Sequence, residues 1–188
     1  VVYVDEEECV NCHACITACP VKFCIDGSGD SVKINHDLCI GCGNCIDACT
    51  HDARSIIDDY DAFIQALAAG EPVVAVVAPA VAAHFPGEYL KLNGYLAAKG
   101  VEAFFDVSFG AELTVKSYLE HIRANKPKMV IAQPCPAIVT YLEIYQPELL
   151  PHLAPADSPM LHAANMINEF FPEYKNHSIA VISPCIAK

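Results

Sequence analysis

The sequence predicts a small, cysteine-rich α+β module followed by an α/β domain with a mainly parallel four-stranded sheet. Cysteines crowd the first fifty residues, four apolar strand-like runs follow, and amphipathic helical segments separate those runs. The strands of a parallel sheet are nearly all apolar, and helices usually connect them. We divide the chain into a module at 1–52, a linking helix at 53–71 and a larger domain at 72–188.

The first module carries eight of the eleven cysteines, in two runs with the spacing C-x2-C-x2-C-x3-C. Three cysteines at two-residue gaps wrap three corners of a [4Fe-4S] cubane, and the fourth ligates the other cluster. The spacing therefore predicts two [4Fe-4S] clusters, arranged as in a bacterial-type ferredoxin. The expected ligands of cluster one are Cys9, Cys12, Cys15 and Cys49, and those of cluster two are Cys39, Cys42, Cys45 and Cys19.

Zinc binding is the one competing interpretation of these thiols. Zinc sites usually pair C-x2-C units at a longer separation and do not favour this triple run repeated twice. Cys24 has no place in the spacing, and we interpret it as a packed thiol rather than a ligand. Thr50 stands where the first run has Pro20, a change that leaves every expected ligand in place.

The linking helix is expected from about Ala53 to Gly70. Apolar residues between Ile56 and Leu67 recur at helical spacing. Gly70 suits a C-cap, and Pro72 prevents the helix from continuing.

In the larger domain, strands and helices alternate. The strand candidates are Val73–Ala78, Val101–Val107, Met129–Ala132 and Ile179–Ile182, and the helix candidates are about Glu88–Lys99, Glu112–Ala124, Ala137–Tyr145 and Met160–Phe170. Three of the strands end in a proline, and Cys135 and Cys185 follow two of these prolines. Ligands of open parallel sheets bind at the carboxyl ends of strands, which favours one shared site for both thiols. Two unrelated buried cysteines remain the alternative.

The charge and hydropathy of the chain exclude several functions. Eleven basic and 23 acidic residues give a net charge of −12, which argues against binding to nucleic acid or an anionic membrane. The surplus of acidic residues suits a redox partner with a basic surface. The alternative is an ordinary acidic surface with no partner. No apolar run approaches the ~20 residues of a membrane span, and no secretory leader is recognisable. Closely spaced cysteines then favour metal in a reducing cytoplasm.

Six segments of the larger domain occur in a telling order: APAV at 78–81, FDVSFGAELT at 105–114, PCPA at 134–137, PELLP at 147–151, SP at 158–159 and SPCIAK at 183–188. Together they resemble the catalytic domain of the [FeFe]-hydrogenases, in the divergent branch associated with sensing. The resemblance implies an anaerobic organism, H2 and protons as reactants, and an electron-carrying protein such as a ferredoxin as partner.

The resemblance also implies roles for residues at the strand ends. Cys135 and Cys185 would be two of the four ligands of the [4Fe-4S] part of the H-cluster. Ala78, Pro79 and the ammonium group of Lys188 would hold the cyanides of the diiron subcluster. A buried ammonium needs a strong acceptor of this kind.

The sequence departs from the family pattern at two further positions of the expected cofactor site. Pro134 stands where typical members have a proton-relaying cysteine, and Ser183 replaces a methionine. Proton transfer by a positioned group contributes about 10²–10⁴ in rate, so turnover should be slow, as suits a sensor.

The family's third cysteine motif does not occur in these 188 residues. We therefore expect an H-cluster only in the complete protein. We expect these 188 residues alone to be inactive as a hydrogenase. A signalling domain C-terminal to Lys188 is one candidate arrangement. The predicted function is reversible H2 oxidation and proton reduction at low turnover. The alternative is a non-enzymatic iron–sulfur protein that transfers electrons or carries clusters.

Overall fold

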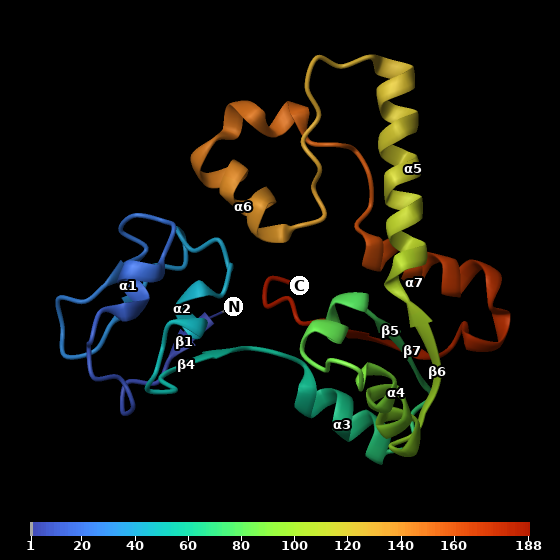
Figure 1. Ribbon diagram of the computed structural model, residues 1–188, viewed down its shortest axis with the longest axis horizontal. Helices are drawn as coiled ribbons and strands as arrows, with labels where there is room; N and C mark the ends of the chain where they lie inside the picture. Colours follow the sequence, from blue (N-terminus) through green and yellow to red (C-terminus); the bar gives the residue numbers. More distant parts are fainter. Residues whose placement is uncertain (1) are drawn as a thin grey trace. The chain divides into compact units, whose positions relative to one another are not determined.

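The computed structural model describes residues 2–188, which form two compact units (Figure 1). The first unit combines the N-terminal residues up to Asp58 with Cys135–Pro151 and Ile186–Lys188. The second unit contains Asp59–Pro134 and His152–Cys185. Two segments of the sequence predicted to form the larger domain thus pack with the cysteine-rich module.

The cysteine-rich part of the first unit consists of two antiparallel strand pairs and two short helices. Its elements are β1 (Val2–Val4), α1 (Ala14–Ala18), β2 (Ile25–Asp26), β3 (Lys33–Ile34), α2 (Asn44–Asp47) and β4 (Arg54–Ile56). Strand β1 pairs with β4 and β2 pairs with β3, so that Val4 lies opposite Arg54 and Ile25 opposite Ile34. Each helix begins within a cysteine loop, directly after a residue in the left-handed conformation.

The linking helix is shorter than predicted. Arg54–Ile56 form β4 rather than helix, because their backbone groups pair with β1, and Ala53 and Arg54 are buried. Helix α3 (Tyr60–Ala68) begins only after this strand, and Gly70 follows it at a φ of +73°.

The buried centre of the first unit contains Cys15, Val21, Cys24, Ile25 and Val32. Helix α6 (Pro136–Tyr145) also belongs to this unit, and its last residue packs against that centre. The Tyr145 hydroxyl donates a hydrogen bond to the backbone oxygen of Leu38.

The second unit is built on a parallel three-stranded sheet with the order β6-β5-β7. The strands are β5 (Val73–Val77), β6 (Val101–Asp106) and β7 (Ser178–Ile182), and the helices are α3, α4 (Tyr89–Ala98), α5 (Val107–Asn125) and α7 (Pro159–Phe170). Shorter 3₁₀ turns cover Pro79–Ala83, Pro147–His152 and Pro172–Tyr174.

The prediction of a fourth strand at Met129–Ala132 is wrong. Ile131 forms only an isolated parallel bridge, to Leu153. Its N–H donates to the carbonyl oxygen of His152 at 2.7 Å, and its own carbonyl accepts from Ala154 at 2.9 Å. The backbone groups that a sheet would use are therefore satisfied by a neighbouring segment.

Successive residues of β5 face opposite layers of helices, as the apolar sequence of this strand predicts. Val74 and Val76 pack against Val107 of α5 and Ala163 and Ile167 of α7. Ala75 faces the other side, where Leu96 of α4 lies. Figure 1 shows α3 and α4 on one side of this sheet and α7 on the other.

Helices α5 and α7 approach each other closely at Gly110, where a β-carbon would overlap the carbonyl oxygen of Pro159. Thr114, one turn later, is buried, and its hydroxyl oxygen lies 3.0 Å from the Gly110 carbonyl and 3.2 Å from the Asp157 carbonyl. Gly110 thus permits the close approach of α5 to α7, and the buried hydroxyl group of Thr114 lies beside it.

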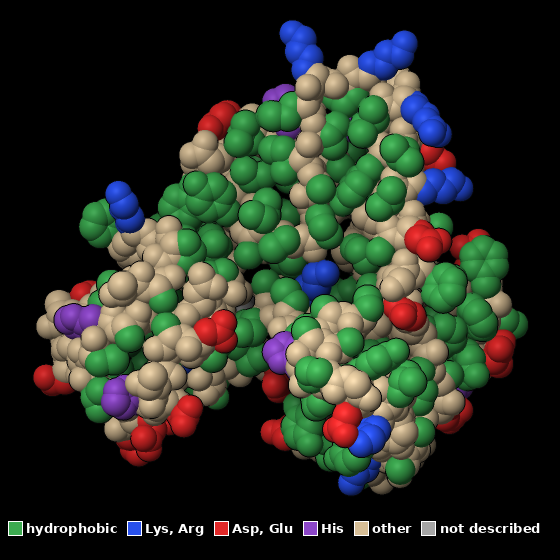
Figure 2. All heavy atoms as spheres, viewed as in Figure 1, with side chains coloured by type: hydrophobic (Ala, Val, Ile, Leu, Met, Phe, Trp, Pro, Cys, Tyr) green, Lys and Arg blue, Asp and Glu red, His purple; other side chains and the backbone are tan. Residues whose placement is uncertain are grey.

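Basic side chains lie at the C-terminal end of helix α5. Arg123 lies in its last turn and Lys126 caps it in the left-handed conformation. Figure 2 shows Lys and Arg side chains gathered at this end of the helix. Cations there are favoured by the partial negative charge of a helix C-terminus. Within residues 2–188, no helix has both the length and the apolar character of a membrane span.

Candidate iron–sulfur centres

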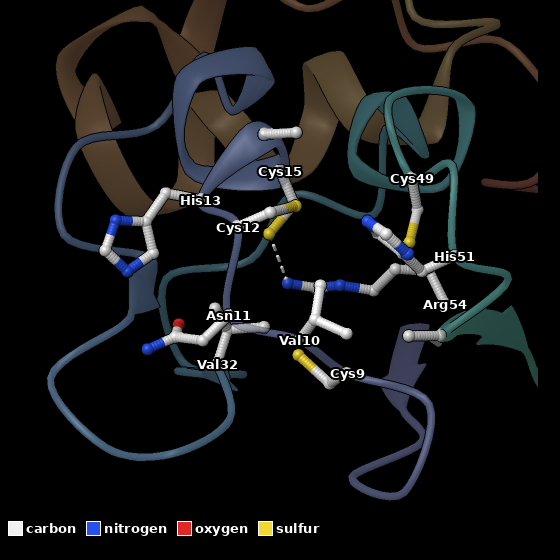
Figure 3. Close-up of a pocket in the computed structure, with 12 residues that line it drawn as sticks. Cys9, Val10, Asn11, Cys12, His13, Cys15, Val32, Cys49, His51 and Arg54 are labelled. Atoms are coloured by element: carbon white, nitrogen blue, oxygen red, sulfur yellow. Dashed lines mark hydrogen bonds between the residues drawn. The ribbon is translucent and has the colours of Figure 1, made fainter.

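One open hollow in the first unit is lined by four thiols. Cys9, Cys12, Cys15 and Cys49 line it, and these are the side chains expected to ligate cluster one. Figure 3 shows the four sulfur-bearing side chains around the hollow, with the Arg54 guanidinium reaching in between them. Two cysteine runs that are distant in the sequence therefore meet at one site.

A second open hollow is lined by the other four thiols of the two runs. These are Cys19, Cys39, Cys42 and Cys45, the side chains expected to ligate cluster two. Cys24 also lines this hollow, with only 2% of its surface exposed. Its Sγ–H donates a hydrogen bond to the carbonyl oxygen of Asn35 at 3.7 Å, as expected for a packed, protonated thiol.

The two hollows are related by an internal repeat, because each cysteine of the first run recurs 30 residues later (Cys9 to Cys39). The backbone follows the repeat. Asn11 and His13 have positive φ angles of 51° and 64°, and the equivalent Gly41 and Gly43 have 69° and 83°. Left-handed residues turn the chain sharply between ligands, which glycine does at least cost.

In the first loop, side-chain hydrogen bonds support the left-handed positions that glycine fills in the second loop. The Asn11 amide donates to the carbonyl oxygens of Gly27 and Gly29, at 3.0 and 2.8 Å. The His13 Nε2 lies 3.3 Å from the Gly27 oxygen. In the second loop, the space beside Gly43 is taken by the Ile186 side chain, whose Cδ1 would lie 2.5 Å from an added β-carbon.

The donor set and its spacing fit an iron–sulfur cubane. Thiolates are the usual ligands of [4Fe-4S] clusters. Among residues 2–188, no three His, Cys, Asp or Glu side chains converge closely enough to hold a single metal ion. A mononuclear zinc site needs ligand sulfurs about 2.3 Å from one centre, whereas a cubane separates its ligands at four corners.

Arg54 is a site residue that the sequence reasoning did not identify. Only 5% of its surface is exposed, and its Nη2 donates a hydrogen bond to the Cys15 sulfur at 2.9 Å. Its Nη1 is buried without a hydrogen-bond partner among the described residues. A comparison of the two halves of the repeat would have revealed this cation, because the first half has no basic residue at the corresponding place.

Burial also affects two thiols of the second hollow. It raises the pKa of the Cys24 thiol to about 12, and the neighbouring Cys39 and Cys19 act in the same direction. Burial raises the pKa of the Cys45 thiol as well, although the positive charge of Arg54 opposes this rise. A bound metal would have to offset the cost of ionising Cys45.

In the second unit, the structure brings together three of the residues predicted to hold the H-cluster. Strands β5 and β7 are parallel and in register at Val77 and Ile182. The Ala78 N–H donates a hydrogen bond to the backbone oxygen of Ile182 at 2.9 Å. Ala78, Pro79 and Ser183 therefore lie together at the carboxyl ends of β5 and β7.

The two cysteines expected at the H-cluster belong to different units. Cys135 is exposed and caps the N-terminus of α6 in the first unit, and Pro134 immediately precedes it as the end of a segment of the second unit. Cys185 is exposed in the second unit, and its N–H donates to the Ser183 hydroxyl oxygen at 3.2 Å. Lys188 belongs to the first unit.

Comparison with known families assigns both parts of the chain. Residues 71–188 match the family described as the iron-only hydrogenase large subunit, C-terminal domain. Residues 1–50 match the 4Fe-4S dicluster domain. Residues 51–70, which include helix α3, lie between the two matches.

Individual relatives agree with these families. The periplasmic [Fe] hydrogenase large subunit of Nitratidesulfovibrio vulgaris is 30% identical over 213 aligned residues, covering all of this chain and 50% of the relative. Iron hydrogenase 1 of Clostridium pasteurianum is 29% identical over 107 residues, covering 52% of this chain and 19% of the relative. The chain thus spans half or less of the length of these relatives.

A solved [FeFe]-hydrogenase structure has a similar fold, with a TM-score of 0.55 and 24% identity over 69% of this chain and 39% of that one. This likeness supports the mixed α/β architecture with a parallel three-stranded sheet. The chain therefore belongs to the iron-only hydrogenase large-subunit family, matching its C-terminal domain and, at residues 1–50, a 4Fe-4S dicluster domain.

Proposed function

We propose that the cysteine-rich module is a ferredoxin-like electron-transfer module that holds two [4Fe-4S] clusters and exchanges electrons with a hydrogenase site. The observation that supports this most directly is the division of eight thiols into two hollows of four. When bound, each cluster would supply one-electron redox chemistry. The protein would bind the clusters through these thiols and set their potentials through hydrogen bonds, burial and charge.

Iron and sulfide analysis of anaerobically reconstituted protein tests whether the module binds two clusters. Two clusters should bring about eight iron and eight sulfide ions per chain. Cys12→Ser and Cys42→Ser should each perturb one cluster, because their thiols line different hollows. Cys24→Ser is the matched control, and both clusters should remain. Loss of a cluster in that control, or one cluster in the wild type, would refute the proposed ligand sets.

For the complete protein we propose a sensory [FeFe]-hydrogenase that catalyses 2H⁺ + 2e⁻ ⇌ H2 slowly. Cys135 and Cys185 would supply two thiolates to an H-cluster, with further ligands from elsewhere in the complete protein. Ala78, Pro79 and Lys188 would hold its diiron part, while Pro134 cannot relay a proton as a thiol does. The shared sheet edge of Ala78, Pro79 and Ser183 supports this proposal for the second unit.

Full-length protein matured with the diiron cofactor tests the hydrogenase. Infrared bands of cyanide and carbon monoxide should appear, and H2 turnover should be slow. Pro134→Cys should raise turnover at least tenfold, given the usual contribution of a positioned proton donor. Ser183→Met is the matched control, because it restores a family residue without adding a proton relay. Absence of the infrared bands would refute the diiron site.

The second candidate is an iron–sulfur protein that transfers electrons or carries clusters without H2 chemistry. Pro134 and Ser183 favour it, since both replace residues expected near the diiron unit. Three cubanes without infrared bands in the matured protein would establish it. Its failure and that of the hydrogenase are therefore distinguishable in one preparation.

The partner and the compartment are part of the same proposal. An electron carrier would dock as the redox partner, and the net charge of −12 suits a basic one. We propose a cytoplasmic location because the thiols must remain reduced before cluster assembly. Cell fractionation tests this location, since one relative is named as periplasmic.

A further inference from the structure

The two hollows differ at one buried position that is equivalent by strand position: Arg54 matches Ile25, 29 residues earlier, although the 30-residue spacing of the cysteines would pair it with Cys24. Ile25 begins β2 and lines the second hollow, whereas Arg54 begins β4 and lines the first. Both strands pair antiparallel with their partners. The preceding residues also match, because the carbonyl oxygens of Cys24 and Ala53 accept from Asn35 and Asp5, at 2.7 and 2.9 Å.

The side chains at this position are both buried, yet they differ by a full charge. Ile25 is 8% exposed and Arg54 is 5% exposed. The Arg54 Nη2 donates to the Cys15 sulfur at 2.9 Å, and Nη1 is buried without a partner among the described residues. A buried cation is costly unless an anion compensates it. A cubane with four thiolate ligands is such an anion.

The rest of the lining differs in the same direction. His51 lines the first hollow, where the repeat places Val21 in the second. Polar and cationic groups near a cluster stabilise its more negative, reduced form. An apolar lining does not offer this stabilisation.

We propose that Arg54 makes the two clusters electronically unequal, so that cluster one has the higher reduction potential and takes up an electron before cluster two. This inference rests on the proposed function, because it requires both clusters. Arg54 acts through the Cys15 sulfur and is therefore a positioning residue rather than a catalytic one. Reduction adds one electron to the cluster, and no covalent bond forms or breaks.

The geometry directs the charge of Arg54 to the first hollow. Its guanidinium donates a hydrogen bond to the sulfur of Cys15, which lines that hollow. Removing the charge should therefore shift the couple of cluster one most.

Redox titration of the reconstituted protein with dithionite, followed by electron paramagnetic resonance, tests the inference. Arg54→Gln should change the oxidised-to-reduced ratio of cluster one at least tenfold, a fall of at least 59 mV for a one-electron couple. Arg54→Lys keeps the charge and should retain most of the wild-type potential. Ile25→Val, at the equivalent position, is the uncharged control and should shift neither couple.

The couple of cluster one is identified as the one that Cys12→Ser perturbs. An unchanged cluster-one potential in R54Q, or the same fall in R54K as in R54Q, would overturn the inference while the two-cluster function stands. Fewer than two clusters in the wild type would overturn both. Arg54→Met gives a second neutral comparison. Loss of cluster one from both neutral variants, but not from R54K, would mean that the charge holds the cluster rather than sets its potential.

Discussion

The Tyr145 hydroxyl group donates a hydrogen bond to the backbone oxygen of Leu38 across 107 residues of sequence, with an oxygen–oxygen distance of 2.9 Å. Tyr145 ends the helix that Cys135 begins, and Leu38 immediately precedes Cys39. The bond therefore ties α6 to a loop that lines the second hollow.

Tyr145→Phe should lower the free energy of unfolding by about 1 kcal/mol, because the partly buried Leu38 carbonyl loses its donor. Denaturation of the reconstituted protein, followed by circular dichroism, measures the change. Tyr141→Phe is the matched control, because the Tyr141 ring stacks at 5.4 Å on the Tyr145 ring and would be retained. An equal loss in both variants would contradict the role given to the Tyr145 hydroxyl.

Two helical glycines should respond to alanine in opposite ways. Gly110→Ala should destabilise the fold by about 3 kcal/mol, because the new methyl group meets the backbone of Pro159 in α7 and neither backbone can yield cheaply. Gly94 in α4 has no neighbouring atom within 4 Å of an added β-carbon, so Gly94→Ala should stabilise the fold by about 0.5–1 kcal/mol. Thermal denaturation of both variants gives the comparison. No loss of stability in Gly110→Ala would refute the close α5–α7 contact.

Gly43→Ala separates backbone strain from side-chain crowding. Its φ of +83° should cost about 1–2 kcal/mol for alanine, and the methyl group would also displace Ile186. Gly70→Ala, at +73° with no atom within 4 Å, should show the backbone cost alone. The excess loss in Gly43→Ala should disappear when Ile186→Ala is added. Persistence of that excess in the double variant would exclude contact with Ile186 as its cause.

Alkylation should distinguish the packed thiol from the exposed ones. Cys24 is 2% exposed and its pKa is about 12, against 9.0 for an ordinary thiol, so its reactive thiolate is about a thousandfold scarcer. Iodoacetamide at pH 8 should label Cys185 in minutes and leave Cys24 unlabelled, as peptide mass spectrometry would show. Rapid labelling of Cys24 in the reconstituted protein would contradict its burial.

The same pKa fixes the direction of a pH effect. The folded state raises the pKa of Cys24, so it favours the protonated thiol over the thiolate. Stability from this residue is fully present below about pH 9 and is lost progressively as the pH rises towards about 12. Cys24→Ala should flatten the decline in this pH range, relative to the wild type, in denaturation curves measured between pH 8 and 11.

The local pattern of the sequence predicted most of the secondary structure. Helices expected at Glu88–Lys99, Ala137–Tyr145 and Met160–Phe170 are confirmed within one or two residues, because apolar periodicity and prolines at helix starts act locally. Helix α5 starts five residues before its predicted start at Glu112, directly after β6. Its cap is Asp106, whose carboxylate accepts from the Ser108 N–H.

The two errors concern segments whose pairing partners are distant in the sequence. Arg54–Ile56 pair with Val2–Val4, and Ile131 bridges to Leu153. Apolar periodicity cannot report such partners, because helix and strand patterns overlap in short apolar runs. Tertiary pairing decides them.

By itself, the sequence specified eight closely spaced thiols and predicted their division into two sets of four. Spacing suffices because a cubane requires thiolates at fixed corners, and a short loop can reach only some of them. The tertiary structure alone decided what surrounds each set. Strand pairing brings Arg54 to one hollow and Ile25 to the other, since a side chain acts on a centre through distance and burial, which the linear order of residues does not specify.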